Sequence, residues 1–167
     1  MKDKYIEQYI NELVDTGILE SIGDGISIQD NDFKILYQNS KHKSFVGEHI
    51  GEFCYKAYEK RENLCEGCPL KMSMENGLPH TSKREAIVNE AMAHFEITAS
   101  PIRNKKGEII AGIEVVRDVS ERTSHEEYLR ENEEKYRLLF SAEKDAIIVV
   151  DAETHNIIDA NDSDELD

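Results

Sequence analysis

Three cysteines are the residues of this sequence whose type and spacing best suit chemistry. Cys54 is followed by Cys65 and Cys68 in the pattern C-x10-C-x2-C-P. A Cys-x-x-Cys pair can present two thiolates to one metal ion, and Cys54 can supply a third ligand of a tetrahedral site. His49 and His80 are the available fourth ligands. We predict a zinc or iron–sulfur site with the ligands Cys54, Cys65, Cys68 and His80.

The same cysteines have two other interpretations. A reversible disulfide between Cys65 and Cys68, or one that involves Cys54, would make the protein a redox sensor. Inert, buried thiols are the third interpretation. Nearby acidic residues would raise the thiol pKa values, which favours a bound cation over a reactive free thiolate. These acidic residues are Glu52, Glu59, Glu62 and Glu66.

The charge of the chain argues against several classes of partner. It carries 20 Lys and Arg against 35 Asp and Glu, a formal net charge of -15. Nucleic acids and anionic membranes bind clustered basic residues, so neither is expected as a partner. No apolar run reaches the roughly 18 residues of a membrane span, and the N-terminus lacks an apolar signal core. With its odd number of cysteines, the chain is predicted to be cytoplasmic.

The first third of the chain predicts a helix and then a hairpin. In residues 1–20, apolar side chains recur at three- and four-residue spacing, as in an amphipathic helix that Gly17 weakens or bends. Residues 26–30 and 33–37 alternate apolar and polar side chains on either side of an Asn-Asp turn. This pattern predicts two half-buried antiparallel strands.

The middle of the chain is predicted to complete an α+β fold. Asn39 is the expected cap of a short helix, and short helices continue to about residue 77. Residues 95–99 and 109–115 alternate around a Gly-containing turn, which predicts a second antiparallel hairpin, and residues 84–88 are a weaker strand candidate. This order of elements indicates helices packed over one antiparallel sheet.

Residues 120–140 are rich in charge and poor in apolar side chains, which predicts a solvated connector helix. Leu129 and Tyr136 are seven residues apart, as are Asn132 and Leu139. This spacing allows a short two-stranded coiled coil.

The sequence contains an internal repeat. Residues 19–39 read LESIGDGISIQDNDFKILYQN, and residues 139–161 read LFSAEKDAIIVVDAETHNIIDAN. The matching pairs are Asp24 and Asp145, Ile26 and Ile147, Ile28 and Val149, Asp30 and Asp151, and Asn39 and Asn161. The copies lie about one domain length apart, so the second copy marks the start of a new unit.

These segments resemble PAS sensory domains. The run GDGISIQD with its hairpin resembles the opening of such domains, and residues 98–122 resemble their closing hairpin. Asp118-Val119-Ser120 is similar to the junction with the output helix. The resemblance implies a five-stranded antiparallel sheet with short flanking helices and a ligand or partner surface. It also implies signalling through terminal helices, often in a homodimer.

The expected organisation has four parts. They are an N-terminal amphipathic helix (1–20), a PAS-like sensor domain (21–119), a helical connector (120–140) and the incomplete start of a second PAS-like domain (141–167). Such a module binds a ligand, metal or redox signal and relays it to an output domain or partner, for example a histidine kinase. The alternatives are a piece of a sensor histidine kinase whose catalytic part lies beyond Asp167, and a pure PAS dimerisation module.

Catalysis and two familiar cofactors are not expected in this chain. Pro69 stands where attachment of c-type haem needs histidine, and Phe53-Cys54-Tyr55 does not match the Asn-Cys-Arg motif of flavin-binding PAS domains. Ser124-His125-Glu126 resembles the phospho-accepting motif of histidine kinases, but its continuation differs. The sequence also lacks nucleotide-binding loops and hydrolase motifs. We therefore predict that the chain is not an enzyme.

Overall fold

The computed structural model describes residues 12, 16–88, 90–142 and 145–161. The chain divides into two compact units, Met1–Ser120 and Glu121–Asp167. Most of the predicted helix over residues 1–20 lies outside the described residues. Within them, helix α2 (Ile18–Ser21) follows Gly17, which has a φ of 68° that glycine adopts without strain.

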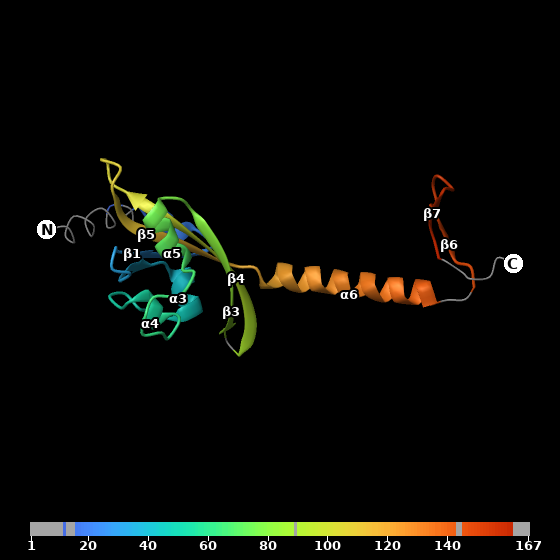
Figure 1. Cartoon of the computed structure of the whole chain (residues 1–167), viewed down its shortest axis with the longest axis horizontal. Coiled ribbons are helices and arrows are strands. Elements are labelled where there is room, and N and C mark those ends of the chain that lie inside the picture. Colours follow the sequence, from blue (N-terminus) through green and yellow to red (C-terminus); the bar gives the residue numbers. More distant parts are fainter. Residues whose placement is uncertain (1–11, 13–15, 89, 143–144, 162–167) are drawn as a thin grey trace. The chain divides into compact units, whose positions relative to one another are not determined.

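One five-stranded sheet forms the first unit's centre (Figure 1). In spatial order its strands are β2 (Ile35–Gln38), β1 (Gly25–Gln29), β5 (Ile109–Asp118), β4 (Ala91–Arg103) and β3 (His80–Val88). All neighbouring strands are antiparallel, and both predicted hairpins are present as β1–β2 and β4–β5. The weaker strand candidate, residues 84–88, is part of the longer strand β3, which pairs with β4. The architecture confirms the predicted α+β fold class.

Three short helices cover one face of this sheet, namely α3 (Ser40–Val46), α4 (Cys54–Ala57) and α5 (Pro69–Asn76). Helix α3 begins at its predicted cap, because Asn39 Oδ1 accepts a hydrogen bond from the His42 N–H at 2.8 Å. Glycines allow the helices to approach the strands closely. A Cβ on Gly25 would lie 3.2 Å from His42 Cα, and one on Gly112 would clash with the Leu70 side chain.

Strand β1 is buried on both faces, so the prediction of a half-buried strand was wrong. Ile26 and Ile28 pack into an apolar core on one face. Ser27 and Gln29 alternate with them and point toward the helices, and both are 0% exposed. Buried polar side chains need hydrogen-bond partners, which here come from β5 and from the segment after α4.

The second unit contains most of helix α6 (Ser120–Ala142) and a hairpin of β6 (Ile148–Val150) and β7 (Ile157–Ala160). Helix α6 spans the residues for which a helix was predicted, and its role as a connector stays a prediction. Its surface carries ion pairs at i,i+4 spacing, which suit a solvated helix. The pairs are Arg122–Glu126, Arg130–Glu134 and Glu133–Arg137.

The two copies of the internal repeat make the same hydrogen bonds. Asn39 and Asn161 each accept a bond from the N–H of the matching isoleucine, at 2.8 and 2.6 Å. Each also donates to the carbonyl of the matching aspartate at 3.0 Å. Asp30 and Asp151 each accept from the N–H two residues later, at 2.9 and 3.0 Å. The polar matches in the repeat therefore have a common structural cause.

Candidate functional site

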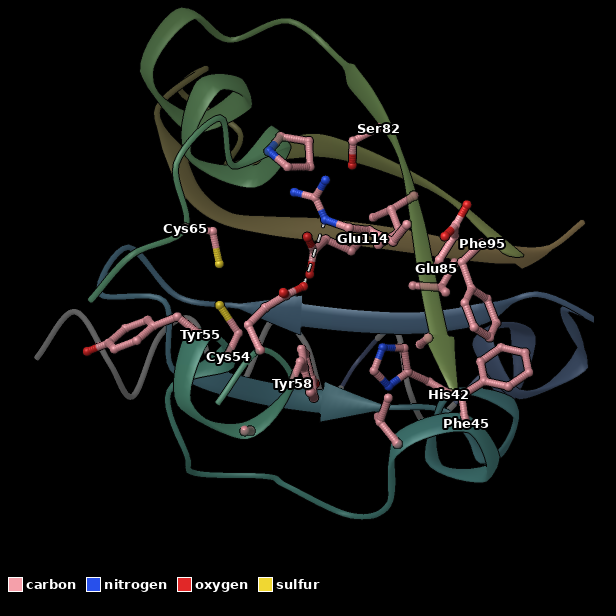
Figure 2. Close-up of a pocket in the computed structure, with 18 of the residues that line it drawn as sticks. His42, Phe45, Cys54, Tyr55, Tyr58, Cys65, Ser82, Glu85, Phe95 and Glu114 are labelled. Atoms are coloured by element: carbon pink, nitrogen blue, oxygen red, sulfur yellow. Dashed lines mark ion pairs between the residues drawn. The ribbon is translucent and has the colours of Figure 1, made fainter. Parts of the chain in front are cut away.

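A cavity of about 380 Å³ lies between the helix-covered face of the sheet and the short helices (Figure 2). Its size falls in the range of small-molecule sites, roughly 300–1,000 Å³. Figure 2 shows Cys54 and Cys65 toward one end of the cavity and Phe45 and Phe95 toward the other, with Glu114 between them. The cavity therefore has a thiol-lined end and an aromatic end.

All three predicted cysteine ligands line this cavity. Cys54 begins α4, Cys68 caps the N-terminus of α5, and Cys65 lies in the loop between these helices. The sulfur atoms of Cys54 and Cys65 point toward one another in Figure 2, and all three thiols are free. Burial is the main cause that raises the pKa of each thiol. The thiols are therefore protonated at neutral pH.

The fourth predicted ligand, His80, lies elsewhere. It begins β3, and its Nε2 is hydrogen-bonded to the Asn76 side chain rather than lining the cavity. In the part of the chain that the structure describes, no group of three or more His, Cys, Asp or Glu side chains is arranged to hold a metal ion. The zinc or iron–sulfur site stays a prediction, and the position of His80 gives it no fourth ligand.

Glu114 is a central residue of the cavity that the sequence did not single out. It lies in the middle of β5, opposite Ser27 on β1 and Ala99 on β4. Burial raises the pKa of Glu114 from its ordinary value of 4.5 to about 7, although the hydrogen bond from Gln29 lowers it. The charge of Glu59 raises this pKa further, and the charge of Arg84 lowers it. This carboxyl group is thus partly protonated at neutral pH.

A largely buried hydrogen-bond chain fixes Glu114 in the cavity. Gln29 Nε2 donates to Glu114 Oε2 at 2.9 Å and to Ser27 Oγ at 2.8 Å. Ser27 Oγ in turn shares a hydrogen bond of 3.0 Å with the Tyr58 hydroxyl, which also lines the cavity. Ser82 Oγ, from β3, is buried without a hydrogen-bond partner among the described residues. The cavity thus offers a bound molecule an unused hydroxyl group.

His42 lines the cavity as a neutral ring with a defined tautomer. Gln38 Oε1 accepts from the His49 N–H at 2.7 Å, so the Gln38 amide must point its Nε2 toward His42 Nδ1 at 2.9 Å. Nδ1 therefore accepts a hydrogen bond, and Nε2 carries the proton. Burial lowers the pKa of His42 to about 4, so the ring is uncharged at neutral pH.

The junction between β5 and α6 is tied to β4. The Val119 N–H donates to the His94 carbonyl at 2.8 Å, and the His94 N–H donates to Ser120 Oγ at 2.8 Å. Ser120 N–H also donates to Asp118 Oδ1 at 2.9 Å, which caps the start of α6. Phe95, which lines the cavity, lies opposite Asp118 in the β4–β5 register. One strand therefore connects the cavity wall to the first residue of α6.

Comparison with known proteins identifies the family. The sequence profile of the family described as PAS fold matches residues 19–124, which is more than half of the chain. The chain therefore belongs to the PAS family. A search of curated protein sequences gave no significant match.

Several solved structures have a similar fold. An RNA-binding light-oxygen-voltage receptor is 19% identical with a TM-score of 0.56, and the match covers 78% of this chain and 39% of that one. The Vibrio cholerae VqmA dimer is 14% identical with a TM-score of 0.53, covering 66% and 52%. A phage VqmA–DPO complex is 14% identical with a TM-score of 0.55, covering 85% and 65%.

At these identities the likeness concerns the fold alone. The chain spans less than two thirds of the length of each of these receptors. None of the helices that the structure describes is both long and apolar enough to cross a bilayer.

Proposed function

We propose that this chain is a non-catalytic sensor module whose cavity binds a small organic molecule and whose occupancy changes the start of α6. The observation that carries the proposal is the shared use of β4 and β5. Phe95 and Val116 line the cavity, whereas His94, next to Phe95, and Asp118, opposite Phe95, hold the junction with α6. A ligand that displaces Phe95 would move β4 next to His94, and would therefore also strain the hydrogen bonds of Ser120.

We propose that the change at the start of α6 is transmitted to a second copy of the chain and to an output domain. Helix α6 exposes Leu129, Tyr136 and Leu139, whose spacing forms a seam with Asn132. Pairing of this seam in a homodimer would carry the signal to an output domain such as a histidine kinase, in cis or in trans. A net charge of -15 favours a protein partner over nucleic acid, although the VqmA structure is described as that of a DNA-binding protein.

Filling the cavity tests the ligand-binding proposal. Ser82 points into the cavity in Figure 2, whereas Thr81, its neighbour on β3, is exposed on the other side of the strand. We expect Ser82→Trp to weaken the binding of small aromatic fragments by about tenfold or more, or about 1.4 kcal/mol. Thr81→Trp, the matched control, should bind them like the wild type. Ligand-observed NMR on all three proteins makes the measurement.

Two results would contradict the proposal. Either no fragment binds the wild-type protein, or Ser82→Trp binds fragments as tightly as the wild type does. Cooperative unfolding of both variants shows that any loss of binding does not come from loss of the fold.

A further inference from the structure

Glu114 is a half-buried acid on the wall of the cavity. Among the ion pairs between described residues, none includes Glu114. Its one hydrogen bond in this part of the chain reaches Oε2 from Gln29. Buried carboxylates are normally paired or strongly hydrogen-bonded, because an unpaired charge away from water is costly. The folded protein therefore holds an acid whose charge is compensated only in part, by the hydrogen bond from Gln29 and by the charge of Arg84.

The cations that line the cavity are already engaged by other groups. Arg84 Nε lies 3.9 Å from Glu59 Oε1, and Lys60 Nζ donates to the Ala57 carbonyl at 2.8 Å. Glu85 adds another carboxylate to the lining. The lining thus carries three acidic side chains against two basic ones, Lys60 and Arg84. Its charge favours a cation as the bound molecule.

The aromatic end of the cavity provides the complementary apolar surface. The rings of Phe45 and Phe95 pack edge to face with centroids 5.0 Å apart, and both lie toward one end of the cavity in Figure 2. Such rings bind apolar groups and attract cations to their faces. In the strand register, Glu114 opposes Ala99, four residues along β4 from Phe95. At roughly 3.3 Å per residue, this is about 13 Å of strand.

We propose that the cavity binds an arylalkylamine, with its ammonium group paired to Glu114 and its aromatic ring against Phe45 and Phe95. This inference rests on the proposed ligand-binding function and adds the charge and shape of the ligand. Because Glu114 and Phe95 lie apart along the sheet, the ligand needs an alkyl spacer between its aromatic ring and its nitrogen. The ammonium group of the ligand would balance the part of the Glu114 negative charge that the protein itself leaves unpaired.

A matched set of probes tests the charge preference in the full chain. The probes are 4-phenylbutylamine, 4-phenylbutanol and 4-phenylbutyrate, which share the ring and spacer and differ in charge. By calorimetry at pH 7, we expect the amine to bind at least about tenfold more tightly than the alcohol, and the carboxylate to bind weakest. Amine binding should also release protons, detected as a dependence of the heat on the ionisation enthalpy of the buffer.

Two variants assign the effect to one residue. Glu114→Gln is expected to remove the preference for the amine and the proton release, whereas Glu96→Gln, on β4 but outside the lining, should keep both. The inference is overturned if the alcohol or the carboxylate binds as tightly as the amine, or if Glu114→Gln keeps the preference. If none of the three probes binds the wild type, this inference is overturned, whereas the ligand-binding function is decided by the fragment measurements on the wild type, Ser82→Trp and Thr81→Trp.

Discussion

The Asn39→Ala variant is expected to lose about 4 kcal/mol of the free energy of unfolding of the first unit, since several buried groups would be left unpaired. Asn39 is 0% exposed and accepts from the N–H groups of Ile26 and His42 at 2.8 Å each. Its Nδ2 donates to the carbonyls of Leu19 and Asp24 at 3.1 and 3.0 Å. One side chain thus joins α2, β1 and the start of α3.

Two variants control this prediction. Asn39→Asp keeps the acceptor oxygen and loses the two donated bonds, so its loss should be intermediate. Asn161→Ala removes the matching bonds in the second unit and should leave the first unit unchanged. Urea unfolding followed through the NMR amide signals of β1 and β5 measures the first unit alone. A loss below about 1 kcal/mol in Asn39→Ala, or an equal loss in Asn161→Ala, would refute this role for Asn39.

The Glu114→Gln variant is expected to be more stable than the wild type above neutral pH. Because the pKa of Glu114 is about 7 in the fold against an ordinary 4.5, the folded state holds a proton that the unfolded state has lost. Stability from this group is complete below pH 4.5 and falls as the pH rises through 7. The wild type should therefore be about 3 kcal/mol less stable than the variant at pH 8 and nearly equal to it at pH 4.

His42 has the opposite pH dependence and partly hides this effect in the wild type. Its pKa is lowered from 6.5 to about 4, so the unfolded state takes up the proton first and stability falls as the pH falls from 6.5 to 4. Between pH 4.5 and 6.5 the two contributions nearly cancel. The difference in unfolding free energy between wild type and Glu114→Gln, measured in urea from pH 4 to 8, isolates Glu114. A difference that does not change with pH would show that the carboxyl group titrates normally.

Local patterns in the sequence predicted the framework of the fold. Alternation of apolar residues predicted both hairpins, and the Asn39 side chain caps α3 where the sequence placed the cap. The repeat was detectable because Asn39 and Asn161 make the same two kinds of bond to the backbone. These features depend on residues that are close in the sequence or opposite in one hairpin.

The site was harder to predict because it depends on what covers the sheet. Alternation in β5 marked Ile113 and Val115 as buried and left Glu114 on the polar face. The short helices cover that face too, so Glu114 lines a cavity instead of facing bulk water. His42 was not predicted as a site residue for the same reason, because its burial follows from the packing of α3 on Gly25.

The cysteines illustrate a related limit. Their spacing correctly pointed to a shared location, since Cys54, Cys65 and Cys68 line one cavity. Sequence distance alone could not place His80, which starts β3 and is bonded to Asn76 at the end of α5.

Hydrogen exchange at the β5–α6 junction tests whether occupancy of the cavity changes the start of α6. The amides of Val119 and His94 report on the junction, because they bond to the His94 carbonyl and to Ser120 Oγ. The indole of Ser82→Trp takes the place of a ligand, and Thr81→Trp is the control on the other side of β3. We predict that Ser82→Trp changes the exchange rate of both amides by about threefold or more, and that Thr81→Trp does not. Equal rates in the wild type and Ser82→Trp would contradict it, because a filled cavity would then leave the output junction unchanged.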